Sequence, residues 1–296
     1  HFPMTSGEVL VIKTLKLGKL DATLDTDVCD AHNNADLTLT LKMGFRQINP
    51  TGGADKGTYR DYGDPSGTPR KIIKWTASEW TKRKNNFCSS AQAFWDKKFW
   101  VLNNNGTFAY KAGSLIMVPN AYCRFKLEGS DASPGIHHHV IDVVRLDPSE
   151  KWFGSHWTLS DSKDTLAVKK ATDTKGKAVM QRAHVHEVGH LLGLGHVDEG
   201  KAHCPVSGDT NAGACYGITD ADKNSVMGSG MRLDAIHGEP WLTALAEFVK
   251  GEAKSSVYTP TAANVGANVV KMKRHYPRSV AEFEAGQLIL SQQKRI

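Results

Sequence analysis

The chain has 296 residues, of which 40% are hydrophobic, and this is enough for one large or two small packed domains. No run approaches the roughly 18 consecutive apolar residues that a membrane-spanning helix needs, so the sequence predicts a soluble globular protein without a membrane span. Lys and Arg number 37 against 31 Asp and Glu, but they are scattered. We therefore expect a solvated basic surface and no nucleic-acid partner.

The first half of the chain predicts strands around one helix. Apolar and polar residues alternate in parts of 7–47, whereas 49–70 is rich in Gly, Pro and Asp and predicts a long loop. An apolar stripe from Trp80 to Trp95 predicts a helix with Ser78 as its N-cap. Further strands are expected at 107–111, 114–118, 123–127, 139–146 and 156–159.

The second half predicts helices separated by a long irregular segment. One helix is expected from Ala178 to about Leu194, because Gly193 and Gly195 suit a helix end. Residues 197–231 show little periodicity, Glu239-Pro240 opens a third helix, and a short helix is expected at 279–290.

Residues 186–196, which read HEVGHLLGLGH, are the most informative segment. Residues four apart lie on the same face of a helix, so His186 and His190 can present two ring nitrogens to one metal ion. Gly193 allows the chain to turn out of the helix and bring His196 to the same ion. Three histidines leave a fourth zinc position for water, and Glu187 is placed to take a proton from it, so the pattern predicts a catalytic zinc site.

This motif, followed by a turn at 225–230 that contains Met227, resembles the metzincin clan of zinc metallopeptidases. The resemblance implies an α+β zincin fold: a twisted mixed sheet, an active-site helix and a smaller C-terminal subdomain. It implies a catalytic domain at about 37–252, preceded by a β-rich segment at 1–36 that could belong to it and followed by a C-terminal extension at 253–296. It also implies zinc ligands His186, His190 and His196, general base Glu187, and Met227 packed beneath the site.

Other histidines allow weaker hypotheses. His137 and His139 lie on one face of a strand and could bind a second metal, although a solvated strand entry is favoured. His184 is expected at the surface or behind the metal ligands. His156, His203 and His237 are candidates for stabilising an oxyanion, but an ordinary polar role is favoured for each.

The five cysteines match no zinc or redox motif. Cys204 and Cys215 flank a loop in which a disulfide would cause little strain, and we expect that bridge. Cys29 could cap the zinc, but an inert or bridged cysteine is favoured. Calcium could bind near Asp198, Asp209, Asp220 and Asp222, although loop aspartates are common without it.

The sequence thus favours a secreted or exported zinc endopeptidase that acts on protein or peptide substrates bound along an edge strand. A catalytically inactive zinc-containing binding module is the main alternative, and the intact Glu187 argues against it. A hydrolase of non-peptide amides is a third possibility, and it would require a closed pocket rather than a groove.

Overall fold

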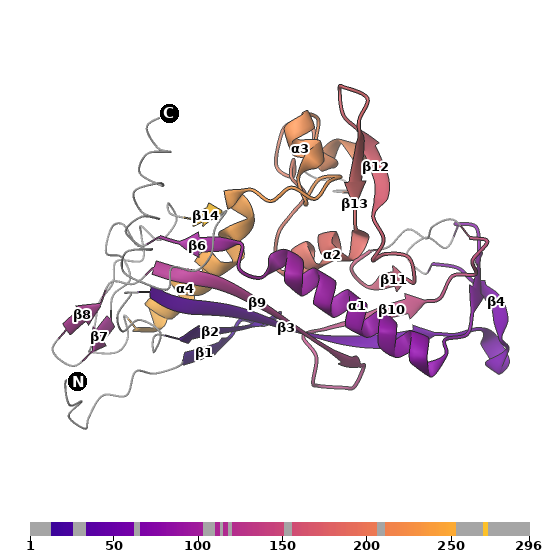
Figure 1. Ribbon diagram of the computed structural model, residues 1–296, viewed down its shortest axis with the longest axis horizontal. Coiled ribbons are helices and arrows are strands. Elements are labelled where there is room, and N and C mark those ends of the chain that lie inside the picture. Colours follow the sequence, from indigo (N-terminus) through magenta and orange to yellow (C-terminus); the bar gives the residue numbers. More distant parts are fainter. Residues whose placement is uncertain are drawn as a thin grey trace.

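The computed structural model describes residues 13–25, 34–61, 66–102, 110–112, 115–117, 120–150, 156–205, 211–252 and 269–271. They form a mixed α+β structure in which one large twisted sheet carries the helices (Figure 1). The position predicted for a helix at 279–290, and Cys29, lie outside these residues. No helix within the described ranges is long and apolar enough to cross a membrane.

The sheet is built around β3 (Asn34–Ile48), which has 15 residues. From Asn34 to Phe45 it pairs in parallel with the whole of β9 (Asn120–Asp131). On the opposite edge, the first part of β3 pairs with β2 (Asp21–Asp25) and the last part pairs with β10 (His139–Val144). The strand β3 therefore connects the part of the sheet that contains β2 to the part that contains β10.

The remaining strands of the sheet extend from these. Antiparallel pairing adds β1 (Lys13–Lys16) to β2 and β6 (Phe99–Val101) to β9, with β14 (Val269–Lys271) beyond β6. The short strand β11 (Leu159–Asp161) pairs in parallel with β10. The sheet is thus mixed, as predicted, and it includes strands from both the 1–36 segment and the 253–296 segment.

Helix α1 (Ala77–Trp95) lies across the sheet and buries the predicted apolar stripe through Trp80, Phe87, Ala91 and Trp95. The prediction of Ser78 as its N-cap is wrong. The Thr76 hydroxyl accepts a hydrogen bond from the Glu79 backbone N–H at 3.3 Å, so the helix begins one position before Ser78.

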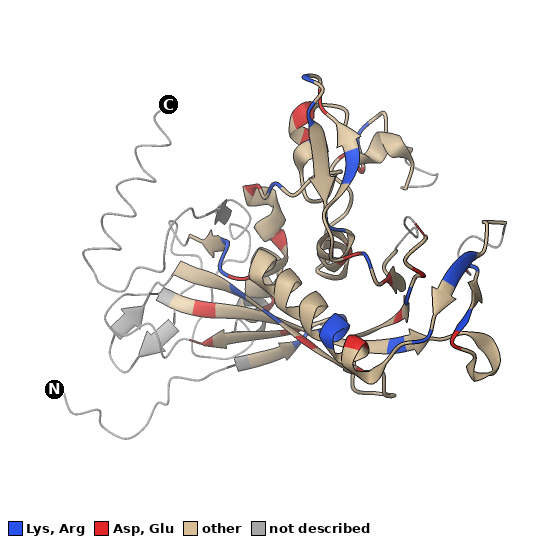
Figure 2. Ribbon diagram, turned by 45° about the vertical axis from the view of Figure 1, so that its right-hand side comes forward, with Lys and Arg blue, Asp and Glu red and all other residues tan. Residues whose placement is uncertain are grey.

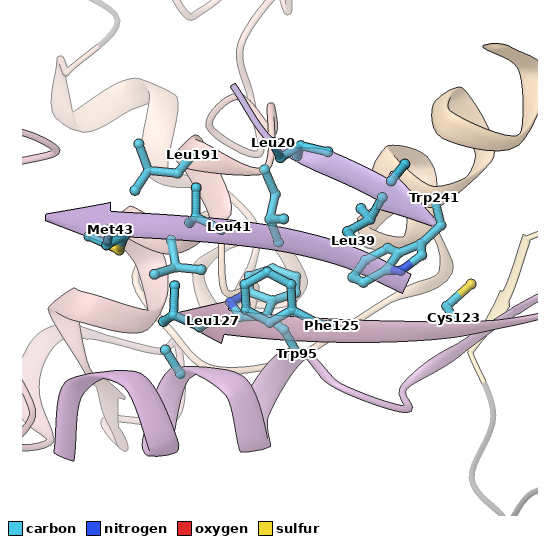
Figure 3. Packing of buried hydrophobic residues seen from close by; sticks show 14 of the residues in the cluster. Leu20, Leu39, Leu41, Met43, Trp95, Cys123, Phe125, Leu127, Leu191 and Trp241 are labelled. Atoms are coloured by element: carbon cyan, nitrogen blue, oxygen red, sulfur yellow. The ribbon is translucent and has the colours of Figure 1, made fainter. Parts of the chain in front are cut away.

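The core lies between the sheet and the helices that cover it. Leu39, Leu41 and Met43 of β3 alternate with outward residues and are fully buried. Figure 3 shows them packed with Trp95, Phe125 and Leu127, and with Leu191 and Trp241 from α2 and α4. The same hydrophobic cluster therefore joins the sheet to the helix that carries the motif.

Two predicted element boundaries need correction. The loop expected at 49–70 contains 3-10 helix η2 (Thr51–Gly53) and β4 (Lys56–Tyr59), which pairs with β5 (Arg70–Ile73). The strand expected at 156–159 instead occupies 159–161 as β11. Of the strands expected at 107–111 and 114–118, the described parts are β7 (Tyr110–Ala112) and β8 (Leu115–Met117), which pair with each other.

The helix expected at 178–194 is also too long at both ends. Residues 178–181 form β13 (Ala178–Gln181), which pairs with β12 (Val168–Thr172), because Val179 and Gln181 alternate into the interior. Helix α2 covers only Ala183–Leu191. Beyond it lie η3 (Gly213–Tyr216), α3 (Asp220–Asn224), η4 (Ala235–Gly238) and the predicted third helix, α4 (Glu239–Glu252).

Candidate metal centre

Three histidines converge at the end of α2. The Nε2 atom of His190 lies 3.1 Å from the Nε2 atoms of both His186 and His196. They are the one group of three or more His, Cys, Asp or Glu side chains, among the residues that the structure describes, with ligand atoms close enough to hold a metal ion. The three predicted ligands are therefore brought together.

The other nitrogens of two of these rings are already engaged. His186 Nδ1 lies 2.7 Å from the Val226 carbonyl oxygen, and His190 Nδ1 lies 2.8 Å from that of Leu194. A carbonyl only accepts hydrogen bonds, so each Nδ1 carries the proton and each Nε2 has a free lone pair. Lone pairs that face one another at 3.1 Å repel unless a cation lies between them, so the donor set fits a metal ion.

Burial keeps the rings of His186 and His190 neutral. Burial, together with the neighbouring histidines, lowers the pKa of His186 to about 3, and burial lowers the pKa of His190. A neutral imidazole is the form that binds a metal ion.

Backbone geometry brings His196 to the other two histidines. Helix α2 ends at Leu191, and Gly193 adopts a φ of 100°, which a side chain would oppose. The resulting turn also places the Leu194 carbonyl against His190, so one feature both orients a ligand and redirects the chain. Beyond His196, the Val197 N–H donates to the Met227 carbonyl at 2.9 Å.

Met227 packs against α2 and lines the same cleft as His190 and His196. It is buried, and a Cβ atom added to Gly189 of α2 would lie 2.4 Å from its sulfur. A glycine is therefore needed on this face of the helix. The Met227 turn is fixed in part by Gln181, whose amide donates to the Gly228 carbonyl at 2.7 Å.

Glu187 lines a cleft of about 1150 Å³ together with His190 and His196. Burial and repulsion from Asp164 raise the pKa of Glu187 to about 8, and Lys170 offsets part of this effect. A positive charge at the three histidines would favour the ionised carboxylate. The group is therefore placed where it can exchange a proton close to neutral pH.

The walls of the cleft come from distant parts of the chain. Trp157 and Ile236 are 52% and 64% exposed there, which is high for large apolar side chains. Tyr216 also lines the cleft, and its ring centroid lies 4.0 Å from that of His196. Sequence reasoning missed Tyr216 and Gln181, because neither belongs to a motif or a periodic pattern.

The other candidate histidines have separate partners. His137 contacts Ser130 and Ser133, whereas His139 Nε2 contacts the Trp157 carbonyl oxygen at 2.5 Å, so these two rings do not converge on a second metal. His156 and His237 line the cleft, but His203 instead contacts Asp198 at 2.8 Å.

His184 is fully buried rather than at the surface. Its Nε2 lies 2.6 Å from the Ser90 hydroxyl of α1, and its Nδ1 lies 3.0 Å from the Asp164 carbonyl oxygen. It therefore anchors the start of α2 behind the ligands.

The calcium hypothesis gains no support in the described part of the chain. Asp198 accepts hydrogen bonds from Lys201, His203 and the Ile218 N–H, while Asp220 accepts two from Thr174. Their oxygens are committed to protein donors and do not form a cluster. Asp209 lies outside the described residues.

The predicted disulfide between Cys204 and Cys215 is present. Cys88 and Cys123 are free thiols, and burial raises the pKa of Cys88 to about 11, which makes it unreactive. Lys and Arg residues are spread over several elements of the described chain (Figure 2), in line with the scattered charge of the sequence.

Comparisons with known proteins gave no match to any family model, to any curated protein or to any solved structure.

Proposed function

We propose that the chain is a zinc-dependent endopeptidase of the metzincin type. The observation that carries the proposal is the convergence of three Nε2 atoms, with a carboxylate beside them, in a cleft larger than most small-molecule pockets. The order of the HExxHxxGxxH motif and the Met227 turn supports the metzincin assignment. The disulfide supports secretion or export, since disulfides persist in oxidising compartments.

Each residue of the site would have a distinct role in peptide hydrolysis. His186, His190 and His196 would hold the ion, which when bound lowers the pKa of a water molecule to about 7 and polarises the substrate carbonyl. Glu187 would accept a proton from the attacking water and donate it to the leaving amine nitrogen. Trp157 and Ile236 offer apolar surface to side chains of the substrate.

The test is cleavage of an unstructured protein such as casein, together with a broad peptide library. We expect activity that a chelator abolishes and zinc restores. Glu187→Gln should lower the rate by about 10²–10⁴-fold at equal zinc content, because the base is lost while the ligands remain. Glu128→Gln makes the same change at a partly exposed position of β9 and serves as the control.

The outcomes separate the two main functions. A wild-type chain that binds zinc but cleaves neither casein nor any library peptide would overturn the peptidase proposal and favour the zinc-containing binding module. Full activity of Glu187→Gln would leave hydrolysis in place but remove Glu187 as its base.

A further inference from the structure

Tyr216 contacts two of the three candidate ligands. Its ring lies 4.0 Å from that of His196 between centroids, and 5.7 Å from that of His186 with an interplanar angle of 19°. The rings of His186 and His196 are themselves stacked, 5.4 Å apart. The aromatic side chain therefore limits how far either imidazole can turn.

The backbone of Tyr216 is held from both sides. Cys215, which precedes it, is bridged to Cys204. Gly217, which follows it, has a φ of 109°, and a Cβ atom there would lie 2.5 Å from the Lys223 backbone nitrogen. The Tyr216 carbonyl oxygen faces Gly228 of the Met227 turn so closely that a Cβ on Gly228 would lie 2.7 Å from it.

Hydrogen bonds connect the same segment to the chain just after His196. The Asp198 N–H donates to the Cys215 carbonyl at 3.1 Å, and the Ile218 N–H donates to the Asp198 carboxylate at 3.1 Å. Asp198 is completely buried. Hydrogen bonds therefore link Asp198 to the segment 215–218, and the disulfide ties the same segment to Cys204.

We propose that Tyr216 is a positioning residue for His196 and that the Cys204–Cys215 disulfide holds Tyr216 in place. The disulfide thereby sets the affinity of the site for its metal ion. This inference rests on the proposed metal centre. Groups that orient metal ligands typically change metal affinity by about 10–100-fold when they are removed.

The experiment measures the dissociation constant for Co²⁺ by its visible absorption, so it does not depend on catalysis. Tyr216→Leu removes the aromatic ring, and the paired change Cys204→Ser with Cys215→Ser removes the bridge without leaving thiolates that could bind the ion. Each should weaken binding by about 10-fold and alter the cobalt spectrum. Tyr216→Phe keeps the ring and should recover most of the affinity.

Two comparisons isolate the positioning role. Tyr59→Leu removes a half-buried tyrosine of β4 that packs against a separate hydrophobic cluster, and it should leave Co²⁺ affinity unchanged. Combining Tyr216→Leu with the two serine changes should cost little more than either alone, because the bridge acts through the ring. Circular dichroism of the metal-free variants checks that each is folded.

Wild-type affinity in folded Tyr216→Leu, or affinity losses that multiply in the combined variant, would overturn this inference and leave the metal centre standing. Failure of the wild-type chain to bind Co²⁺ would overturn the metal centre itself, and this inference with it. If Tyr216→Phe is as weak as Tyr216→Leu, the hydroxyl rather than the stacked ring is required, and the proposed positioning by stacking is wrong.

Discussion

Glu187 is adjacent in sequence to a candidate ligand and is only partly exposed, so its carboxyl group experiences both burial and any charge held at the histidines. In the folded protein without a metal ion, the pKa of the Glu187 carboxyl group is about 8. The value expected in an unfolded chain is about 4.5. Because the pKa of Glu187 differs between the folded and unfolded states, this single residue makes the free energy of unfolding depend on pH.

The first prediction concerns metal-free Glu187→Gln. A group whose folded-state pKa is raised contributes its full stability below the unfolded pKa and loses it as the pH rises through the folded value. Above pH 8 the wild-type protein must bury an ionised carboxylate, whereas the glutamine stays neutral. We expect the variant to be more stable by roughly 1–3 kcal/mol at pH 9 and equal to wild type near pH 4.5, as measured by urea unfolding with a chelator present. A difference that does not change with pH would contradict the assignment.

A second prediction follows from the contact between Gly189 and Met227. In Gly189→Ala, the new Cβ would lie 2.4 Å from the Met227 sulfur and 3.1 Å from Trp95, so α2 or the methionine must shift. We expect a loss of about 1–3 kcal/mol in the free energy of unfolding. Gly213→Ala, where nothing lies within 4 Å of the added atom, is the control and should change stability by less than about 0.5 kcal/mol. Equal effects of the two changes would show that the contact is not tight.

At the scale of elements, the position at which α2 ends determines whether His196 can reach the other two histidines. The helix ends one residue after His190, and the turn at Gly193 returns the chain so that His196 reaches the same point. A helix that continued to Leu194, as the sequence pattern predicts, would carry His196 away from the other two ligands. The positive φ at Gly193 therefore helps to bring the three histidines together.

The third prediction distinguishes the role of Gly193 in metal binding from the backbone strain that alanine causes at any positive φ. Gly193 and Gly200 both have positive φ and open space around them, so alanine at either site should cost about 1–2 kcal/mol of stability through the backbone alone. Only Gly193→Ala should also weaken metal binding, by about 10-fold or more, since only that turn lies between two ligands. Isothermal titration with zinc distinguishes the two variants, and an equal affinity for zinc would contradict the role assigned to the turn.

At the scale of the whole molecule, helix α2 and its candidate ligands contact parts of the chain that are far apart in sequence. Val226, of the Met227 turn, accepts a hydrogen bond from His186. Trp95 of α1 donates its indole N–H to the Val185 carbonyl at 3.2 Å, and Leu191 of α2 lies in the core with strands of the sheet. Binding an ion to the histidines should therefore stabilise the whole cooperative unit.

The fourth prediction is that zinc raises the melting temperature of the metal-free chain. At a free zinc concentration 100 times the dissociation constant, binding adds about 2.7 kcal/mol, which corresponds to a rise of several degrees. His190→Ala should abolish the rise, whereas His137→Ala, which removes a histidine outside the site, should retain it. A rise that persists in His190→Ala would place the zinc elsewhere. Differential scanning calorimetry provides the measurement.

The sequence by itself determined the identity of the three converging histidines, the carboxylate beside them, the disulfide and the mixed character of the sheet. The histidines depend on local spacing, since side chains four apart share a helical face, and the disulfide depends on a short loop between two cysteines. Only the tertiary structure decided that 178–181 is a strand, that His184 is buried, and that Tyr216 lies against His196. Those features depend on contacts between segments distant in the chain, where strand pairing and close packing override local preference.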